Sequence, residues 1–106
     1  MSQMPHEEKS ATNYVKELKS KEENEPIAAF LNMRLMELNL GYAKVTMKLL
    51  PEYQNFNGFI FGGVIMSVAD QAFAYATNSL AYPSVASQVN IYYIAGASIG
   101  DELTAE

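Results

Sequence analysis

The stretch from Tyr53 to Gly100 contains one charged side chain, Asp70, among apolar, aromatic, glycine and neutral polar residues. Both flanking segments carry charges at an ordinary density, so the lack of charge is local to this stretch. A carboxylate in such surroundings is costly to bury unless it is paired or functional. We therefore expect this stretch to form the core of the fold, and Asp70 is the first candidate functional residue.

The size and charge of the chain exclude several classes of protein. Its 106 residues allow one domain with a modest core, and a hydrophobic share of 49% is typical of a globular fold. The net charge of −5 argues against a nucleic-acid surface, because no basic stripe is present to displace counterions. The chain has no cysteine, which excludes disulfides, thiolate metal ligands and a cysteine nucleophile and fits a cytoplasmic protein.

The long uncharged stretch could be mistaken for a membrane span. It is interrupted by asparagines, glutamines and Pro83, and Asp70 lies near its centre. A central aspartate costs ~2.5–3.5 kcal/mol on insertion scales. We therefore predict no membrane segment, and the polar N-terminus shows no secretion signal.

The first half of the chain predicts a charged N-terminal helix or tail, followed by a short helix and a hairpin. Residues 1–24 are strongly charged and predict a solvated helix or tail, or else a segment with a docking role, ahead of a domain at 25–106. Pro26 is well placed as an early residue of a short helix that ends near Leu31. The two-residue alternation of 33–39, which groups Met33, Leu35, Glu37 and Asn39, and that of 43–49 predict two strands joined around Gly41.

The second half predicts a buried helix followed by strands. After an asparagine-rich loop at 51–61, residues 64–79 are apolar around almost the whole helical circumference, so this helix should be enclosed. Residues 85–94 predict a buried strand, Gly100 a turn, and 103–106 the start of another strand. The predicted class is α+β, with an antiparallel sheet around one central helix.

Two features of the long helix are candidates for chemistry. The glycine pair Gly62-Gly63 at its start would let a ligand oxygen approach backbone N–H groups, which makes an oxyanion site, or else it only permits a tight turn. Asp70 is a candidate general base or nucleophile, or else a structural carboxylate. Eight residues separate Gly62 from Asp70, which is ~12 Å along a helix axis. If both serve one site they must come from two copies of the chain, most simply across a two-fold axis.

Other polar residues are weaker candidates. Asn55 and Asn57 could orient water or a carbonyl group, although loop asparagines are more often turn formers. Ser87 and the other serines of this half have no nearby histidine, so a serine triad is not supported. No histidine or acidic cluster has the spacing of metal ligands, and the predicted metal content is none.

Five motifs together resemble the hotdog-fold acyl-CoA thioesterases of the phenylacetate-pathway (PaaI-like) type. They are Asn55-Phe56-Asn57-Gly58, Phe61-Gly62-Gly63, Val68-Ala69-Asp70-Gln71-Ala72, Ala76-Thr77-Asn78-Ser79 and Gly100-Asp101-Glu102-Leu103-Thr104-Ala105. The resemblance runs from about Pro26 to the end of the sequence and keeps the order and spacing of the motifs.

The resemblance implies hydrolysis of acyl-CoA or arylacetyl-CoA thioesters by a homodimer or homotetramer. It implies Asp70 as base or nucleophile, the Gly62 N–H of the partner subunit as oxyanion donor, and Asn55 as a residue that places water or the carbonyl. Gly63, Phe61, Asn57 and Ser87 would contact the substrate. No cofactor is implied beyond the coenzyme A of the substrate itself.

Two departures from the family pattern keep alternatives open. Phe61 stands where the family usually has histidine, and phenylalanine cannot donate a hydrogen bond. The sequence also ends near a point where the family continues with further strands, so C-terminal strands of the sheet are expected to be missing. A non-catalytic acyl-CoA-binding module and an inactive truncated chain are the alternative functions.

Overall fold

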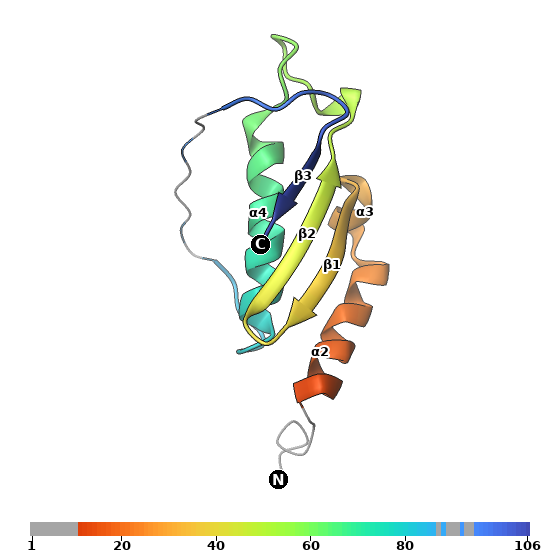
Figure 1. Ribbon diagram of the computed structural model, residues 1–106, viewed down its shortest axis with the longest axis vertical. Coiled ribbons are helices and arrows are strands. Elements are labelled where there is room, and N and C mark those ends of the chain that lie inside the picture. The colour runs from red at the N-terminus through yellow and green to blue at the C-terminus, as the bar shows by residue number, and fades with distance from the viewer. Residues whose placement is uncertain (1–10, 87, 89–91, 93–94) are drawn as a thin grey trace.

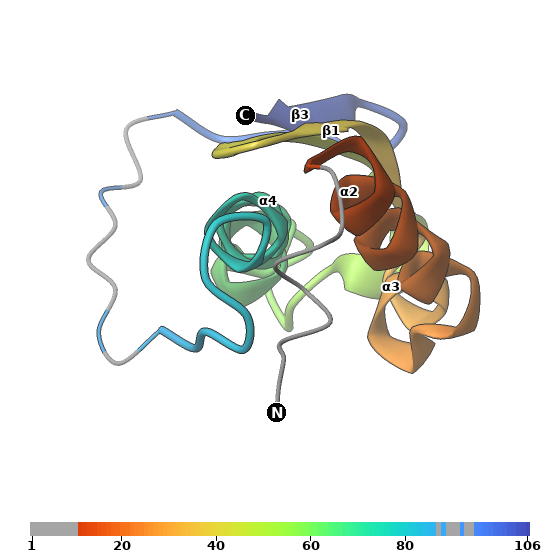
Figure 2. The same ribbon diagram turned by 90° about the horizontal axis from the view of Figure 1, so that it is seen from below.

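The protein is described by a computed structural model that covers residues 11–86, 88, 92 and 95–106. Its elements, in chain order, are α2 (Ala11–Ser20), η1 (Lys21–Asn24), α3 (Pro26–Phe30), β1 (Met33–Asn39), β2 (Tyr42–Lys48), η2 (Pro51–Tyr53), α4 (Gly62–Asn78) and β3 (Glu102–Ala105). The strands form an antiparallel sheet in the order β1-β2-β3. The helices lie on one side of this sheet (Figures 1 and 2). The predicted α+β class is confirmed.

The hairpin of β1 and β2 is confirmed, but its alternation contains an irregularity. Gly41 adopts a φ of 74° in the connecting turn, a conformation that suits glycine. The pairing shifts by one residue between Leu35 and Glu37, so Met36 is an extra residue in β1. Beyond this bulge Leu38 is buried and Glu37 is exposed. The prediction that Glu37 shares the side of Met33 and Leu35 was therefore wrong.

The N-terminal segment, taken as residues 11–25 in the structure, packs on the rest of the chain. Most of residues 15–20 of α2 are exposed, as in a solvated helix, but Leu18 is only 5% exposed and belongs to the core. The carboxylate of Glu22 accepts a hydrogen bond from the backbone N–H of Leu35, at the bulge of β1. The predicted short helix does begin at Pro26, in the position where its missing N–H costs nothing.

The long helix α4 crosses the sheet and lies mainly over β2 (Figure 1). One side is buried, at Val68, Gln71, Ala72 and Tyr75. The expectation that the whole circumference is enclosed was wrong for a single chain, because the three strands lie on one side of the helix only (Figure 2). On another side Phe73 is 50% exposed.

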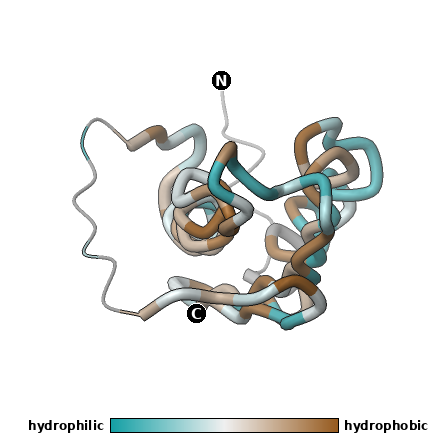
Figure 3. Tube along the Cα trace, turned by 90° about the horizontal axis from the view of Figure 1, so that it is seen from above, coloured by the Kyte–Doolittle hydropathy of each residue, from teal (hydrophilic) through white to brown (hydrophobic). Residues whose placement is uncertain are grey.

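Hydrophobic residues lie on both the sheet and the helices that face it (Figure 3). Val45, Met47 and Leu49 are the most completely buried large side chains in the core, at 0–1% exposure. They all belong to β2 or follow it directly, so β2 is the centre of the core. Among the described residues, no helix is long and apolar enough to cross a membrane.

The C-terminal predictions have mixed outcomes. The turn before β3 is confirmed, with Gly100 at a φ of 92°, and β3 forms close to the predicted place. The strand predicted at 85–94 lies largely outside the described residues. Two of its described members, Val85 and Tyr92, are 93% and 87% exposed, and neither is in a strand.

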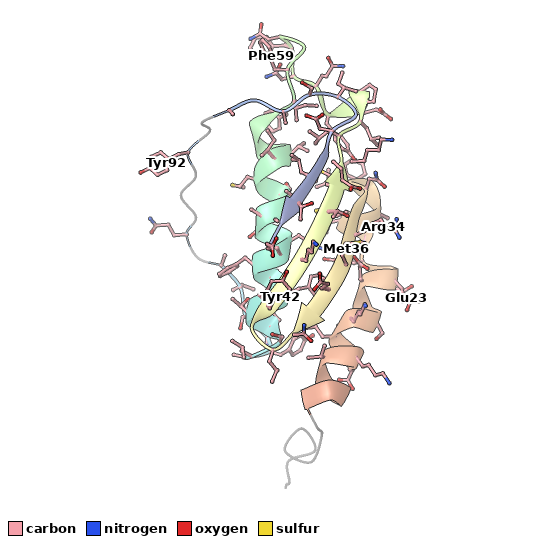
Figure 4. The ribbon with its side chains drawn as sticks, viewed as in Figure 1. Glu23, Arg34, Met36, Tyr42, Phe59 and Tyr92 are labelled. Atoms are coloured by element: carbon pink, nitrogen blue, oxygen red, sulfur yellow. The ribbon has the colours of Figure 1, made fainter. Side chains whose placement is uncertain are left out.

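Two methionines of the hairpin give a matched test of this core. Met47 is 1% exposed, whereas Met36, at the bulge, is 48% exposed (Figure 4). We expect Met47→Ala to lower the free energy of unfolding by ~2–5 kcal/mol, because it leaves a cavity. Met36→Ala should change it by less than ~0.5 kcal/mol. Urea denaturation monitored by circular dichroism measures both, and equal losses in the two variants would contradict the assigned core.

Candidate functional site

The amino-terminal turn of α4 is built around Phe61. This residue is extended, with φ −60° and ψ 127°, and its carbonyl oxygen accepts hydrogen bonds from the N–H groups of Val64 and Ile65 at 3.0 and 3.4 Å. Gly62 and Gly63 follow it and are half-buried. A Cβ atom on Gly63 would lie 2.7 Å from Cε2 of Phe61, so the glycine allows the aromatic ring to lie directly against the helix backbone.

The loop before this turn is held by Asn55. Its side-chain oxygen accepts hydrogen bonds from the backbone N–H groups of Asn57 and Phe59, at 2.9 and 3.2 Å. Its backbone N–H donates to the carbonyl of Phe59, and its carbonyl accepts from Gly58, which has a φ of 80°. Asn55 thus acts as a turn former here, and only its amide NH₂ group is left to contact a substrate. Asn57 is exposed, and Phe59 lies at the tip of the loop (Figure 4).

Asp70 lies two turns further along α4, on an exposed part of its surface. At ~1.5 Å per residue, its Cα is ~12 Å along the axis from that of Gly62. At ~100° per residue, Asp70 points to nearly the same side of the helix as Gly63. Within one chain the carboxylate is therefore neither buried nor close to the glycine pair. The expectation of a buried carboxylate was wrong for the single chain.

A cavity of about 390 Å³ lies beside the amino end of α4. It is lined by Phe30, Leu31, Leu50, Glu52, Tyr53, Gln54, Phe61 and Val64. Apart from Phe61, none of these residues was a candidate from sequence. They come from α3, η2 and the ends of other elements, which no local periodicity connects. Phe30 is 79% exposed although it is large and apolar, so this side of the cavity is open to solvent.

The hydroxyl group of Tyr53 is buried beside this cavity. It has no hydrogen-bond partner among the described residues. Burial, and to a lesser extent the charge of Glu52, raises the pKa of Tyr53. The hydroxyl therefore stays protonated at neutral pH as a buried donor.

A second polar cluster joins the N-terminal segment to α4. One carboxylate oxygen of Glu25, Oε1, accepts hydrogen bonds from the side-chain amide of Gln71 at 2.7 Å and from the hydroxyl of Tyr75 at 2.8 Å. Both donors belong to buried residues of α4. Burial, followed by the hydrogen bond to Glu25, raises the pKa of Tyr75 above its ordinary value. Sequence reasoning missed this cluster, although polar residues four apart on an apolar helix were a signal for it.

Two predictions from sequence remain, the substrate contact at Ser87 and the expected lack of a metal site. Ser87 lies outside the described residues. No group of three histidine, cysteine, aspartate or glutamate side chains that could hold a metal is found in the described part of the chain.

Known proteins resemble this chain in sequence and in fold. The model of the family described as the thioesterase superfamily matches residues 57–106, which include the glycine pair and Asp70. A putative esterase of Archaeoglobus fulgidus is 40% identical over 83 residues, which are 78% of this chain and 54% of that protein. The acyl-coenzyme A thioesterase PaaI of Escherichia coli K12 is 37% identical over 83 residues, covering 78% and 59%. The chain thus spans a little over half the length of these curated relatives.

The solved structure of the E. coli PaaI protein from the phenylacetic acid degradation operon superimposes with a TM-score of 0.81. The two share 32% sequence identity, and the match covers 90% of this chain and 70% of that one. With its antiparallel sheet and long helix, the chain belongs to the PaaI-like branch of the hotdog-fold thioesterase superfamily.

Proposed function

We propose that this protein hydrolyses small acyl-CoA thioesters, with Asp70 as general base or nucleophile. The observation that carries the proposal is the position of Asp70 on α4, two turns beyond the glycine pair, in a chain of a thioesterase family. The thioester carbonyl would be polarised by the backbone N–H of Gly62 in a second copy of the chain. Each copy would supply one carboxylate and one glycine turn, so a homodimer would have two sites.

The reaction needs a nucleophile and a stabilised oxyanion. With Asp70 as base, its carboxylate takes a proton from water while the water oxygen attacks the carbonyl carbon. The negative charge that develops on the carbonyl oxygen is stabilised at the positive end of the helix dipole of α4. The carbon–sulfur bond then breaks, and the proton passes to the sulfur of coenzyme A as it leaves. As nucleophile, Asp70 would attack the carbon itself, and the carbon–sulfur bond would break to give a mixed anhydride and the coenzyme A thiolate. Water would then hydrolyse the anhydride, which returns the Asp70 carboxylate, and a proton from that water would end on the thiolate.

The two-copy arrangement is supported by what a single chain leaves open. Phe73, one turn along α4 from Asp70, is half exposed, and Ala69 is also exposed. A groove of about 270 Å³ lies along this part of α4, lined partly by Phe73, Tyr42 and Ala105. A second chain packed there would remove water from the carboxylate, which strengthens its electrostatic interactions.

The cavity at the amino end of α4 is the proposed acyl pocket. Its volume of about 390 Å³ suits a small group, and Phe30, Leu31, Leu50 and Val64 make its lining largely apolar. Phe61 borders both this cavity and the glycine pair, so its ring is placed to contact the acyl group beside the thioester. Asn57 and Ser87 are further proposed contacts, and the amide NH₂ group of Asn55 could orient water. The proposal requires no cofactor and no metal, since coenzyme A arrives with the substrate.

The direct test is release of free coenzyme A from a panel of acyl-CoA esters, followed with a thiol reagent. We expect Asp70→Asn to lower kcat by about 10²- to 10⁴-fold, because asparagine keeps the shape of the side chain but cannot act as a base or nucleophile. Asp101→Asn is the control, because this aspartate closes the turn before β3 and is remote from α4 in the chain. Full turnover by Asp70→Asn would exclude the mechanism, and binding of esters without thiol release would favour the non-catalytic module.

The contact between Phe61 and Gly63 makes a separate prediction. Gly63→Ala adds helix propensity of ~1 kcal/mol but pushes the Phe61 ring away from the helix. In a Phe61→Ala background the same methyl group meets no ring. We therefore expect Gly63→Ala to be more favourable in that background by ~0.5–1 kcal/mol, measured by urea denaturation as a double-mutant cycle. Additive effects of the two substitutions would show that the ring does not lie on the glycine.

A further inference from the structure

We propose that Glu25 is a positioning residue, whose carboxylate sets the rotation of α4 and hence the direction in which Asp70 points. The inference rests on the proposed function, because it assigns Asp70 a role in the reaction. It concerns a different part of the molecule, since Glu25 lies in the N-terminal segment, between η1 and α3.

The hydrogen bonds of Glu25 join distant parts of the chain. Its Oε1 accepts from Gln71 at 2.7 Å and from Tyr75 at 2.8 Å, across 46 and 50 residues of sequence. The two donors stand four positions apart on α4, so they lie on the same side of the helix, one turn from each other. One oxygen therefore holds two successive turns, which restrains both the rotation of the helix and its sliding along its axis.

The apolar contacts of α4 provide weaker restraint. Its most buried apolar residues toward the core are Val68, Ala72 and Tyr75. Val64, Ile65 and Ala76 also pack against the core, and such apolar contacts are not directional. Hydrogen bonds depend steeply on direction, so the bonds to Glu25 define the rotation more closely.

The link to Asp70 is the helix itself. Asp70 precedes Gln71, and the two side chains are ~100° apart around the axis. A side-chain tip lies ~5–6 Å from the axis, so a rotation of 10° would move the Asp70 carboxylate by ~1 Å. Misplacement of a reacting group by ~1 Å can cost ~10²-fold in rate. A small rotation of α4 is thus enough to affect catalysis while the fold is kept.

Glu25 is itself held from its own side of the molecule. The preceding η1 turn is tied to β1 through the hydrogen bond from Leu35 to Glu22. Leu18 anchors α2 in the core. The N-terminal segment is therefore a fixed support against which α4 is aligned.

The test compares Glu25→Ala with Glu25→Gln, which keeps an acceptor oxygen, and with Glu23→Ala as the matched control. Glu23 is exposed and points away from the molecule (Figure 4). At a temperature where circular dichroism shows all variants folded, we expect Glu25→Ala to lower kcat about 10-fold or more with little change in KM. Glu25→Gln should recover most of the activity, and Glu23→Ala should match the wild type. Unchanged kcat in folded Glu25→Ala would overturn the proposal.

Two additions keep the test decisive. If Glu25→Ala does not fold, Tyr75→Phe and Gln71→Met each remove one donor, and normal kcat in both would overturn the proposal. The second is an NMR readout that is independent of activity: the backbone amide signal of Asp70 should shift in Glu25→Ala but not in Glu23→Ala. Failure of the proposed function would appear differently, as normal turnover by Asp70→Asn or as no turnover by the wild type. In that case the NMR signal of the Asp70 amide alone would decide whether Glu25 orients α4.

Discussion

The packing of α4 against one side of a three-stranded sheet is the constraint on which the rest of the structure depends. β2 supplies the most deeply buried side chains, and α4 lies over it, so the position of the helix follows from the core. A regular helix then fixes the spacing of everything it carries. Gly62 and Asp70 stay ~12 Å apart along the axis whatever the side chains do, because the rise per residue does not vary. A site that needs both groups must therefore be shared between two copies.

The N-terminal segment changes how this core is understood. Its composition is that of a solvated tail, yet it contributes Leu18 to the core and two glutamates to polar contacts with β1 and α4. Such contacts are directional, whereas apolar burial is not. The sheet thus determines where α4 lies, and the carboxylate of Glu25 determines how it is turned.

Much of the fold could be predicted from residue patterns. The hairpin, the short helix from Pro26 and the long helix after the glycine pair all have clear periodicity and clear end signals. The bulge at Met36 could not be predicted, because the alternation of 33–39 carries no sign of it and the adjacent hydrogen bond, from Leu35 to a glutamate 13 residues earlier, forms only in the folded chain. The enclosure of α4 within one chain was overestimated. A helix that is apolar all round must be buried, but its sequence does not say whether the same chain or another copy buries it. The residues of the cavity at the amino end of α4 were missed, apart from Phe61, because they meet only in the folded chain.

The most direct measurement of the shared site is complementation between Asp70→Asn and Gly62→Pro. Proline suits the first position of a helix, and Phe61 already has the extended conformation that a residue before proline adopts. We therefore expect Gly62→Pro to remove the N–H while the helix still forms, which circular dichroism checks. Each variant alone should be inactive. After the two are unfolded together and refolded as a mixture, half of the dimers are mixed and each has one intact site, so about a quarter of wild-type activity should return. If the mixture stays as inactive as its parents while mixed dimers form, the two groups do not act across an interface.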